Sequence, residues 1–193
     1  MRRAVFIDRD GVLNELVPDP ISGLPESPLD ARLVVLVPGA AAALRRLHEA
    51  DFVLVGVSNQ PAAAKGVVEL ADLERVQRRV ASLLEGEDAG LDAFKLCFHH
   101  PSGVVPELTR ACDCRKPAPG MLLEAAAELE VTLEGSWLVG DTDDDVRAGA
   151  AAGCRTVLVE NPGSAHKRNG SVEPDALAAD VAEAAEIVLR APR

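Results

Sequence analysis

The chain has 193 residues, enough for one domain with a sizeable buried core. Its composition, 48% hydrophobic and 26% charged, is that of an ordinary folded protein. The 31 acidic and 20 basic residues give a formal charge of −11, and such a charge repels nucleic acid and anionic lipid surfaces. We therefore expect a single domain over residues 1–193, with neither a nucleic-acid nor a membrane partner.

Apolar runs in this sequence are too short for a secretory or membrane-spanning segment, and the first of them covers only residues 4–7. We therefore expect a cytoplasmic protein, and we expect it to be a monomer. The four cysteines would then lie in a reducing compartment. Metal ligation is a better first interpretation of them than disulfide formation.

Short runs rich in Val, Ile and Leu alternate with longer segments of helical period, a pattern typical of repeated βα units. In chain order the pattern predicts strand 4–7, helix 39–50, strand 52–57, helix 70–85, strand 95–98, helix 120–130, strand 137–139, helix 144–152, strand 156–159 and helix 178–189. Segments rich in proline, glycine or polar residues predict surface loops over 16–30, 101–114 and 161–175. The fold class is therefore α/β, a three-layer Rossmann-like parallel sheet with helices on both faces.

Two carboxylates, Asp8 and Asp10, follow the first predicted strand, and Gly11 allows a sharp turn there. Residues two apart in an extended chain point to the same side. Their charges would repel each other unless a cation or a proton intervenes. A single Asp after a strand more often caps a turn, so this pair alone does not establish a site.

Other strand ends supply groups suited to phosphoryl chemistry. The second strand leads into Ser58 and Asn59, and the fourth leads into Asp141. The carboxyl ends of parallel strands share one edge, so these groups should converge on one crevice. In the acidic run that follows, the start of a helix explains Asp143 and Asp144, but it does not account for Asp141 directly after the apolar strand.

Oxygen ligands of this kind suit Mg²⁺, which takes one or two carboxylates together with water and phosphate. Asp8 and Asp141 can supply those carboxylates. An ionised Asp8 can act as a nucleophile, and Asp10 can give a proton to a leaving alcohol and later take one from water. Ser58 and Lys116 would neutralise and orient the phosphoryl oxygens.

Four segments in this order resemble the motifs of the haloacid dehalogenase superfamily of phosphatases: Asp8-Arg9-Asp10-Gly11, Ser58-Asn59-Gln60, Arg115-Lys116-Pro117 and Gly140-Asp141-Thr142-Asp143-Asp144-Asp145. The resemblance covers residues 4 to about 160. It implies a magnesium-dependent phosphatase that forms an aspartyl-phosphate on Asp8, with Asp10 as acid/base and backbone-carbonyl metal ligand. It also implies Asp141 as the other metal ligand and Asp145 as support for the site.

A second cluster combines three cysteines and one histidine, in two pairs of residues two apart: Cys97, His99, Cys112 and Cys114. Three thiolates and one imidazole form a closed tetrahedral zinc site, and such a closed site is structural rather than catalytic. Zinc would order the loop over residues 97–114 and fix Arg115 and Lys116 beside the phosphate pocket. The alternatives are buried free thiols, the interpretation we give to Cys154, or a thiol pair that oxidises.

The segments between the motifs are too short for a cap domain, so the site should be open. The cysteine pattern resembles a capless, zinc-bearing subgroup that contains histidinol-phosphate and heptose 1,7-bisphosphate phosphatases. The long loop before Cys112 is similar to the heptose branch, in which one phosphate of D-glycero-D-manno-heptose 1,7-bisphosphate is hydrolysed and Arg115 would help hold the substrate, with Asn59 also at the phosphate pocket. Thr142 and Lys65 stand where heptose relatives usually have Lys and Arg.

Several alternatives therefore stay open. The substrate could be histidinol phosphate or another small phosphorylated metabolite. Phosphoryl transfer to a second sugar is disfavoured because an open site does not exclude water. From a different class, a zinc-stabilised binding scaffold is disfavoured for nucleic acid by the net charge of −11.

Overall fold

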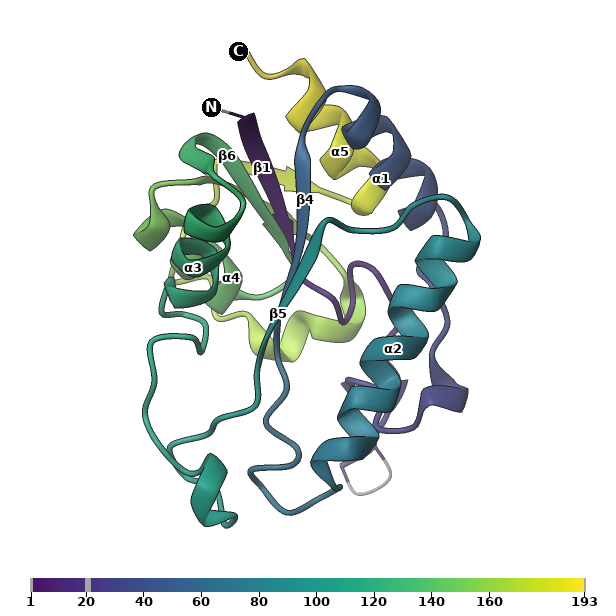
Figure 1. Ribbon diagram of the computed structural model, residues 1–193, viewed down its shortest axis with the longest axis vertical. Coiled ribbons are helices and arrows are strands. Elements are labelled where there is room, and N and C mark those ends of the chain that lie inside the picture. The colour runs from purple at the N-terminus through teal and green to yellow at the C-terminus, as the bar shows by residue number, and fades with distance from the viewer. Residues whose placement is uncertain (1, 20–21, 193) are drawn as a thin grey trace.

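The computed structural model describes residues 2–19 and 22–192, so residues 20 and 21 of the predicted loop 16–30 lie outside the described residues. A parallel sheet forms the middle of the molecule, with strand order β5-β4-β1-β6-β7-β8 (Figure 1). Its strands are β1 Arg2–Ile7, β4 Val53–Asn59, β5 Ala93–Cys97, β6 Val131–Gly140, β7 Arg155–Val159 and β8 Ala176–Ala178. The apolar first strand is central, because it pairs with β4 on one side and β6 on the other.

Helices cover both faces of this sheet, as the fold class predicted (Figure 1). On one face, α1 Ala40–Glu49, α2 Leu70–Gly86 and α5 Val181–Arg190 pack on strand residues such as Ile7 and Leu54. On the other, α3 Gly120–Glu128 and α4 Asp143–Ala152 pack on Phe6 and Val55. Successive residues of a strand point to opposite faces, so the continuous apolar runs of β1 and β4 fill both cores.

The ten predicted elements are present, with shifted ends. The strand predicted over 52–57 continues to Asn59, and the strand predicted over 137–139 begins six residues earlier at Val131. The helix predicted over 120–130 ends at Glu128, and the helix over 144–152 begins at Asp143 and is closed by Gly153 with φ of 81°. These shifts leave every predicted strand end at the same edge of the sheet.

One prediction at the C-terminal end was wrong in detail. The helix predicted over 178–189 begins only at Val181, because the Asp180 side chain accepts a hydrogen bond from the Glu183 backbone and caps the helix there. The preceding residues form β8, which the sequence pattern did not predict. Three residues next to a helical pattern are too few for a period of two to be recognised.

The predicted loops contain short elements. Loop 16–30 holds an antiparallel pair, β2 Val17–Pro18 and β3 Pro25–Glu26, which the sequence analysis did not predict. The described residues also form three 3₁₀ helices: η1 Ala31–Leu33 just after loop 16–30, η2 Pro106–Leu108 in loop 101–114 and η3 Pro162–Lys167 in loop 161–175. Within the described ranges, the segment from β1 to β4 holds α1 and short elements, and the segment from β4 to β5 holds α2.

No helix within the described residues is both long and apolar enough to span a membrane.

Candidate active site

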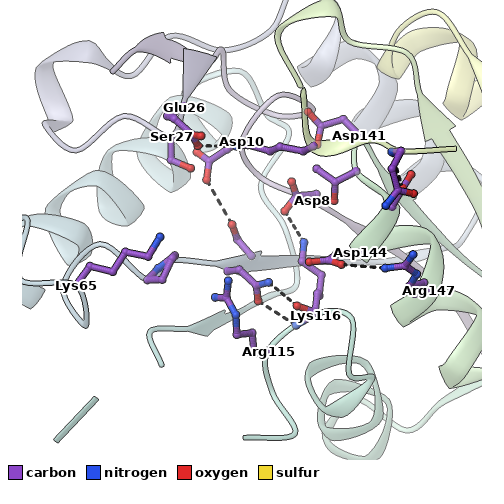
Figure 2. A pocket seen from close by; sticks show the side chains of 17 residues that line it. Asp8, Asp10, Glu26, Ser27, Lys65, Arg115, Lys116, Asp141, Asp144 and Arg147 are labelled. Atoms are coloured by element: carbon purple, nitrogen blue, oxygen red, sulfur yellow. Dashed lines mark hydrogen bonds and ion pairs between the residues drawn. The ribbon is translucent and has the colours of Figure 1, made fainter. Parts of the chain in front are cut away.

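The predicted catalytic residues meet in one pocket at the carboxyl edge of the sheet (Figure 2). Asp8 follows β1 directly, Ser58 and Asn59 end β4, and Asp141 follows β6 directly. Other residues that line the pocket come from the loops and from α4; among them are Asp10, Glu26, Lys65, Arg115, Lys116, Arg147 and Lys167. Parallel strands deliver these side chains from distant parts of the sequence to one edge, as predicted.

Lys116 joins two carboxylates at the floor of this pocket. Its Nζ donates a hydrogen bond to Asp8 Oδ1 at 2.6 Å and forms an ion pair with Asp145 Oδ1, also at 2.6 Å. A third bond goes to the carbonyl oxygen of Val57. Burial opposes the charge, but Asp145 and Asp8 outweigh it and raise the pKa of Lys116 above its ordinary value. The side chain is therefore a fixed buried cation between Asp8 and Asp145.

Asp141 is a buried carboxylate, and neither of its carboxyl oxygens has a hydrogen-bond partner among the described residues. Carboxylate oxygens of Asp8, Asp141 and Asp145 lie within 4.8 Å of one another. Burial, followed by the charges of Asp8 and Asp145, raises the pKa of Asp141 well above its ordinary value. Such an arrangement of hard oxygen donors fits a divalent cation, which would satisfy the unpaired oxygens.

Gly11 keeps the turn after β1 close to this cluster. Its φ of 89° lies in the left-handed region, and a methyl group at this position would overlap Asp141 Oδ2. The turn predicted from the glycine therefore also brings the chain against Asp141.

Asp8 itself is a buried carboxylate with mixed surroundings. Burial raises its pKa to about 7, although the charge of Lys116 opposes the shift. A second positive charge near the carboxylate would return it to the ionised form that a nucleophile needs.

Asp10 is held differently, by donors that the sequence analysis did not single out. Arg9 forms a buried ion pair with it at 3.0 Å, Asn14 donates to its Oδ1 at 3.0 Å, and Gln60 donates to its Oδ2 at 2.6 Å. Burial alone would raise the pKa of Asp10, but Arg9 and these hydrogen bonds lower it. Arg9 and Gln60 belong to the first and second motifs, one residue after Asp8 and two residues after Ser58. This position was the feature of the sequence that could have indicated their role.

The predicted phosphate-binding residues lie around the same pocket. The buried Ser58 hydroxyl lies 3.4 Å from Asp10 Oδ2. Asn59 has a further role that was not predicted, because its amide both donates to the Lys116 carbonyl at 2.9 Å and accepts from the Lys116 backbone at 3.0 Å. Arg115 and Lys65 both line the pocket, and in Figure 2 both lie below Asp8 and Asp10.

The acidic run after β6 divides as expected. Asp143 begins α4, and Asp144 pairs with Arg147 one turn later, at 3.8 Å. Asp145 instead closes a capping box, because its carboxylate accepts hydrogen bonds from the Thr142 backbone and hydroxyl. The same carboxylate forms an ion pair with Lys116, which connects the start of α4 with the pocket at the carboxyl edge of the sheet.

The Cys/His cluster lies at the end of β5, beside the pocket. The thiols of Cys97, Cys112 and Cys114 are 3.1 to 3.5 Å apart, and His99 Nδ1 lies 3.3 Å from the Cys114 thiol. Ligand atoms around a tetrahedral zinc ion are separated by roughly 3.5 to 3.8 Å. These four side chains therefore fit a metal ion of zinc's geometry. Cys154 lies apart and is buried, as predicted.

A buried Asp/Lys centre at the carboxyl edge of a parallel α/β sheet fits a phosphatase of the haloacid dehalogenase type. A family model described as HAD-hydrolase-like matches residues 113–184. The D-glycero-beta-D-manno-heptose-1,7-bisphosphate 7-phosphatase of Salmonella typhi is 34% identical over 160 residues, covering 83% of this chain and 81% of the relative. The enzyme of the same name from Escherichia coli K12 is 35% identical over 166 residues, covering 83% and 80%.

A solved structure agrees with these relatives. The D,D-heptose 1,7-bisphosphate phosphatase of B. bronchiseptica, complexed with magnesium and phosphate, has a TM-score of 0.80 and 30% identity, covering 97% of this chain and 98% of the other. The chain belongs to this family of heptose bisphosphate phosphatases within the haloacid dehalogenase superfamily. It is therefore a phosphoric monoester hydrolase, as the four motifs predicted.

Proposed function

We propose that this protein is a magnesium-dependent phosphatase that hydrolyses one phosphate of a sugar bisphosphate, D-glycero-D-manno-heptose 1,7-bisphosphate, through an aspartyl-phosphate on Asp8. The observation that carries the mechanism is the position of Asp8 between Lys116, a fixed cation, and Asp141, a carboxylate without a partner. The substrate is the one named for relatives that share 34% and 35% of their residues with this chain over most of its length.

The residues divide the work as follows. Lys116 holds Asp8 Oδ1, so the other oxygen of Asp8 is left to attack the phosphorus atom. The bond from phosphorus to the sugar oxygen breaks, and Asp10 gives that oxygen a proton. Asp10 then takes a proton from the water that attacks the aspartyl-phosphate, which releases inorganic phosphate and restores Asp8. Ser58, Lys116 and the amide of Asn59 stabilise the equatorial oxygens.

Two metals complete the proposal. Magnesium, held by the carboxylates of Asp8 and Asp141 and by the backbone carbonyl of Asp10, would supply the positive charge that neutralises the carboxylates and the phosphoryl group. Cys97, His99, Cys112 and Cys114 are the proposed ligands of zinc, and the role of the zinc ion is to fix the loop 97–114. Because Arg115 and Lys116 follow Cys114 directly, an ordered loop places both cations at the pocket.

The test is phosphate release with Mg²⁺ across a panel that contains heptose 1,7-bisphosphate in both anomers, histidinol phosphate and other sugar phosphates. Asp8→Asn is measured beside it, because this change keeps the size of the side chain and removes the nucleophile. We expect the heptose bisphosphate to have the highest kcat/KM and the variant to be inactive while it keeps its zinc. Preference for histidinol phosphate would replace the substrate, and full activity of Asp8→Asn would overturn the mechanism.

A further inference from the structure

The Asp10 carboxylate has more donors around it than a simple turn requires. Its Oδ1 accepts hydrogen bonds from Arg9 Nε at 3.1 Å, Arg9 Nη2 at 3.0 Å and Asn14 Nδ2 at 3.0 Å. Its Oδ2 accepts from Arg9 Nη2 at 3.0 Å and Gln60 Nε2 at 2.6 Å, with the Ser58 hydroxyl farther away at 3.4 Å. A carboxylate has about four lone-pair directions, and these donors occupy most of them, Oδ1 more fully than Oδ2. Its orientation is fixed from several sides.

Arg9 supplies the charge in this arrangement. The side chain is fully buried, and besides the fork on Asp10 its Nη1 donates to Gln77 Oε1 of α2 at 3.2 Å. A buried guanidinium whose ion pair is with one neighbouring carboxylate does not serve solubility or phosphate binding. Since Asp8 and Asp141 are also buried carboxylates nearby, Asp10 without Arg9 would be repelled from the site.

Gln60 connects Asp10 with the phosphate pocket. Its Nε2 donates to Asp10 Oδ2 at 2.6 Å and to the Ser58 hydroxyl at 2.9 Å, and the Gln60 side chain is buried. The group proposed to bind the phosphoryl oxygens and the group proposed to move the proton therefore share one donor. The Ser58 hydroxyl, which faces Asp10 Oδ2 at 3.4 Å, can donate to a bound phosphoryl oxygen while it still accepts from Gln60, so Gln60 links a bound phosphoryl group to Asp10.

We infer that Arg9 and Gln60 are positioning residues for proton transfer: they hold the Asp10 carboxyl in place for the leaving alcohol, and Gln60 couples that placement to phosphoryl binding at Ser58. The inference rests on the proposed function, because it assigns residues to one step of that reaction. Neither residue touches the reacting atoms; both act through Asp10.

The dependence on the leaving group tests this role. Breaking the bond to a sugar alcohol needs a proton from Asp10, whereas 2,4-dinitrophenolate leaves without one. The parameter kcat/KM reports steps up to the formation of the aspartyl-phosphate, so hydrolysis of that intermediate does not obscure the comparison. The substrates are D-glycero-beta-D-manno-heptose 1,7-bisphosphate and 2,4-dinitrophenyl phosphate, and the variant is Gln60→Met, which keeps the volume and removes the donor.

We expect Gln60→Met to lower kcat/KM for the sugar substrate by about 10- to 100-fold, and for the dinitrophenyl ester by no more than about threefold. Arg9→Lys keeps the charge but not the two-pronged contact, and should show the same selectivity. Asp10→Asn provides the benchmark, with a larger loss in the same pattern. Thermal unfolding of each variant reports on its fold.

Equal losses on both substrates in Gln60→Met and Arg9→Lys would overturn the inference, because they would indicate general damage to the pocket. Unchanged kinetics on both substrates would overturn it as well. Failure of the proposed function looks different: Asp8→Asn would then keep its activity, or Asp10→Asn would show no preference between the two leaving groups.

Discussion

The carboxylate centre and the Cys/His cluster lie at the same edge of the sheet and are held together in different ways. In the carboxylate centre, Asp8 and Asp141 stand at the ends of central strands, and Lys116 already neutralises part of the negative charge. In the Cys/His cluster, Cys97 ends the edge strand β5 and Cys112 and Cys114 come from a loop.

The two clusters differ in the charged groups that surround their side chains. Burial first, and then the neighbouring thiols Cys97 and Cys112, raise the pKa of Cys114. Burial also opposes ionisation of Cys112, but hydrogen bonds from Cys114 and Cys97 lower its pKa. The sheet and a buried cation assemble the carboxylate centre, whereas the geometry of the Cys/His cluster would depend on the zinc ion that we propose it binds. Each prediction below separates these two kinds of support.

The largest effect should come from removing the cation of the carboxylate centre. Lys116→Met leaves the carboxylates of Asp8 and Asp145 buried without it, and the free energy of unfolding should fall by about 3 to 5 kcal/mol. Urea unfolding at pH 7 in the presence of a chelator measures the loss. Added Mg²⁺ should recover part of it, because a divalent cation also neutralises the carboxylates.

Lys95→Met is the matched control. Lys95 pairs with Glu124 and Glu128, whose side chains are exposed, so its loss should cost no more than about 1 kcal/mol. Similar losses in both variants would contradict the special role of Lys116.

The pH dependence of the metal-free protein tests the same centre without a substitution at Lys116. Burial raises the pKa of Asp8 from 3.8 to about 7, so between these values the unfolded chain gives up a proton that the folded protein keeps. The free energy of unfolding should therefore fall as the pH rises from about 4 to 7, by about 1.4 kcal/mol for each unit of pKa difference. Asp141 is shifted in the same direction and adds to the slope.

Chemical denaturation across this pH range, in the wild type and in Asp8→Asn, isolates the contribution of Asp8. The difference between the two proteins should disappear at saturating Mg²⁺, because the cation stabilises the ionised carboxylate. A slope that is the same in both metal-free proteins would mean that Asp8 does not keep its proton to such high pH.

A smaller effect on activity is expected from the Cys/His cluster. Cys112→Ser should release zinc and lower kcat/KM by about 10- to 100-fold, because Arg115 and Lys116 lose their fixed loop. Hydrogen exchange should rise in residues 98–115 and stay unchanged in β1 and β6. Elemental analysis gives the zinc content.

Cys154→Ala is the control for loss of a thiol, since Cys154 lies outside the cluster and should leave the zinc content unchanged. Full activity in zinc-free Cys112→Ser would mean that the carboxylate centre needs no support from the loop.

Residues at strand ends could be predicted from the sequence because parallel strands share one carboxyl edge, whatever lies between them. This placed Asp8, Ser58 and Asp141 together, and the two-residue spacing of the ligands did the same for the Cys/His cluster. The partners of these residues could not be predicted in this way. Arg9 reaches Gln77 across 68 residues of sequence, and such contacts depend on how α2 packs rather than on any local pattern.

Short elements were missed for a related reason. The pair β2 and β3 has two residues in each strand, too few for an alternating pattern to be recognised. The β3 strand gains support from outside, because Lys167 of η3 pairs with Glu26 at 2.6 Å. Glu26 and Lys167 are 141 residues apart in the sequence, so their contact could be identified only from the folded structure, in which both loops lie at the pocket.

The smallest effect concerns Asn59, which joins the two regions. Its amide holds the Lys116 backbone from both sides, at 2.9 and 3.0 Å, so Asn59→Ala should lower the free energy of unfolding by about 1 to 2 kcal/mol and reduce kcat through a displaced Lys116. Asn59→Asp keeps the acceptor but sets a carboxylate oxygen against the Lys116 carbonyl oxygen, so it should lower the free energy of unfolding by at least as much as Asn59→Ala. Urea unfolding and steady-state kinetics measure both. A rise in KM alone, with stability and kcat unchanged, would mean that Asn59 acts only through its proposed contact with the phosphoryl group. Lys116 would then be held in place by its carboxylates and the loop 97–114 without help from β4.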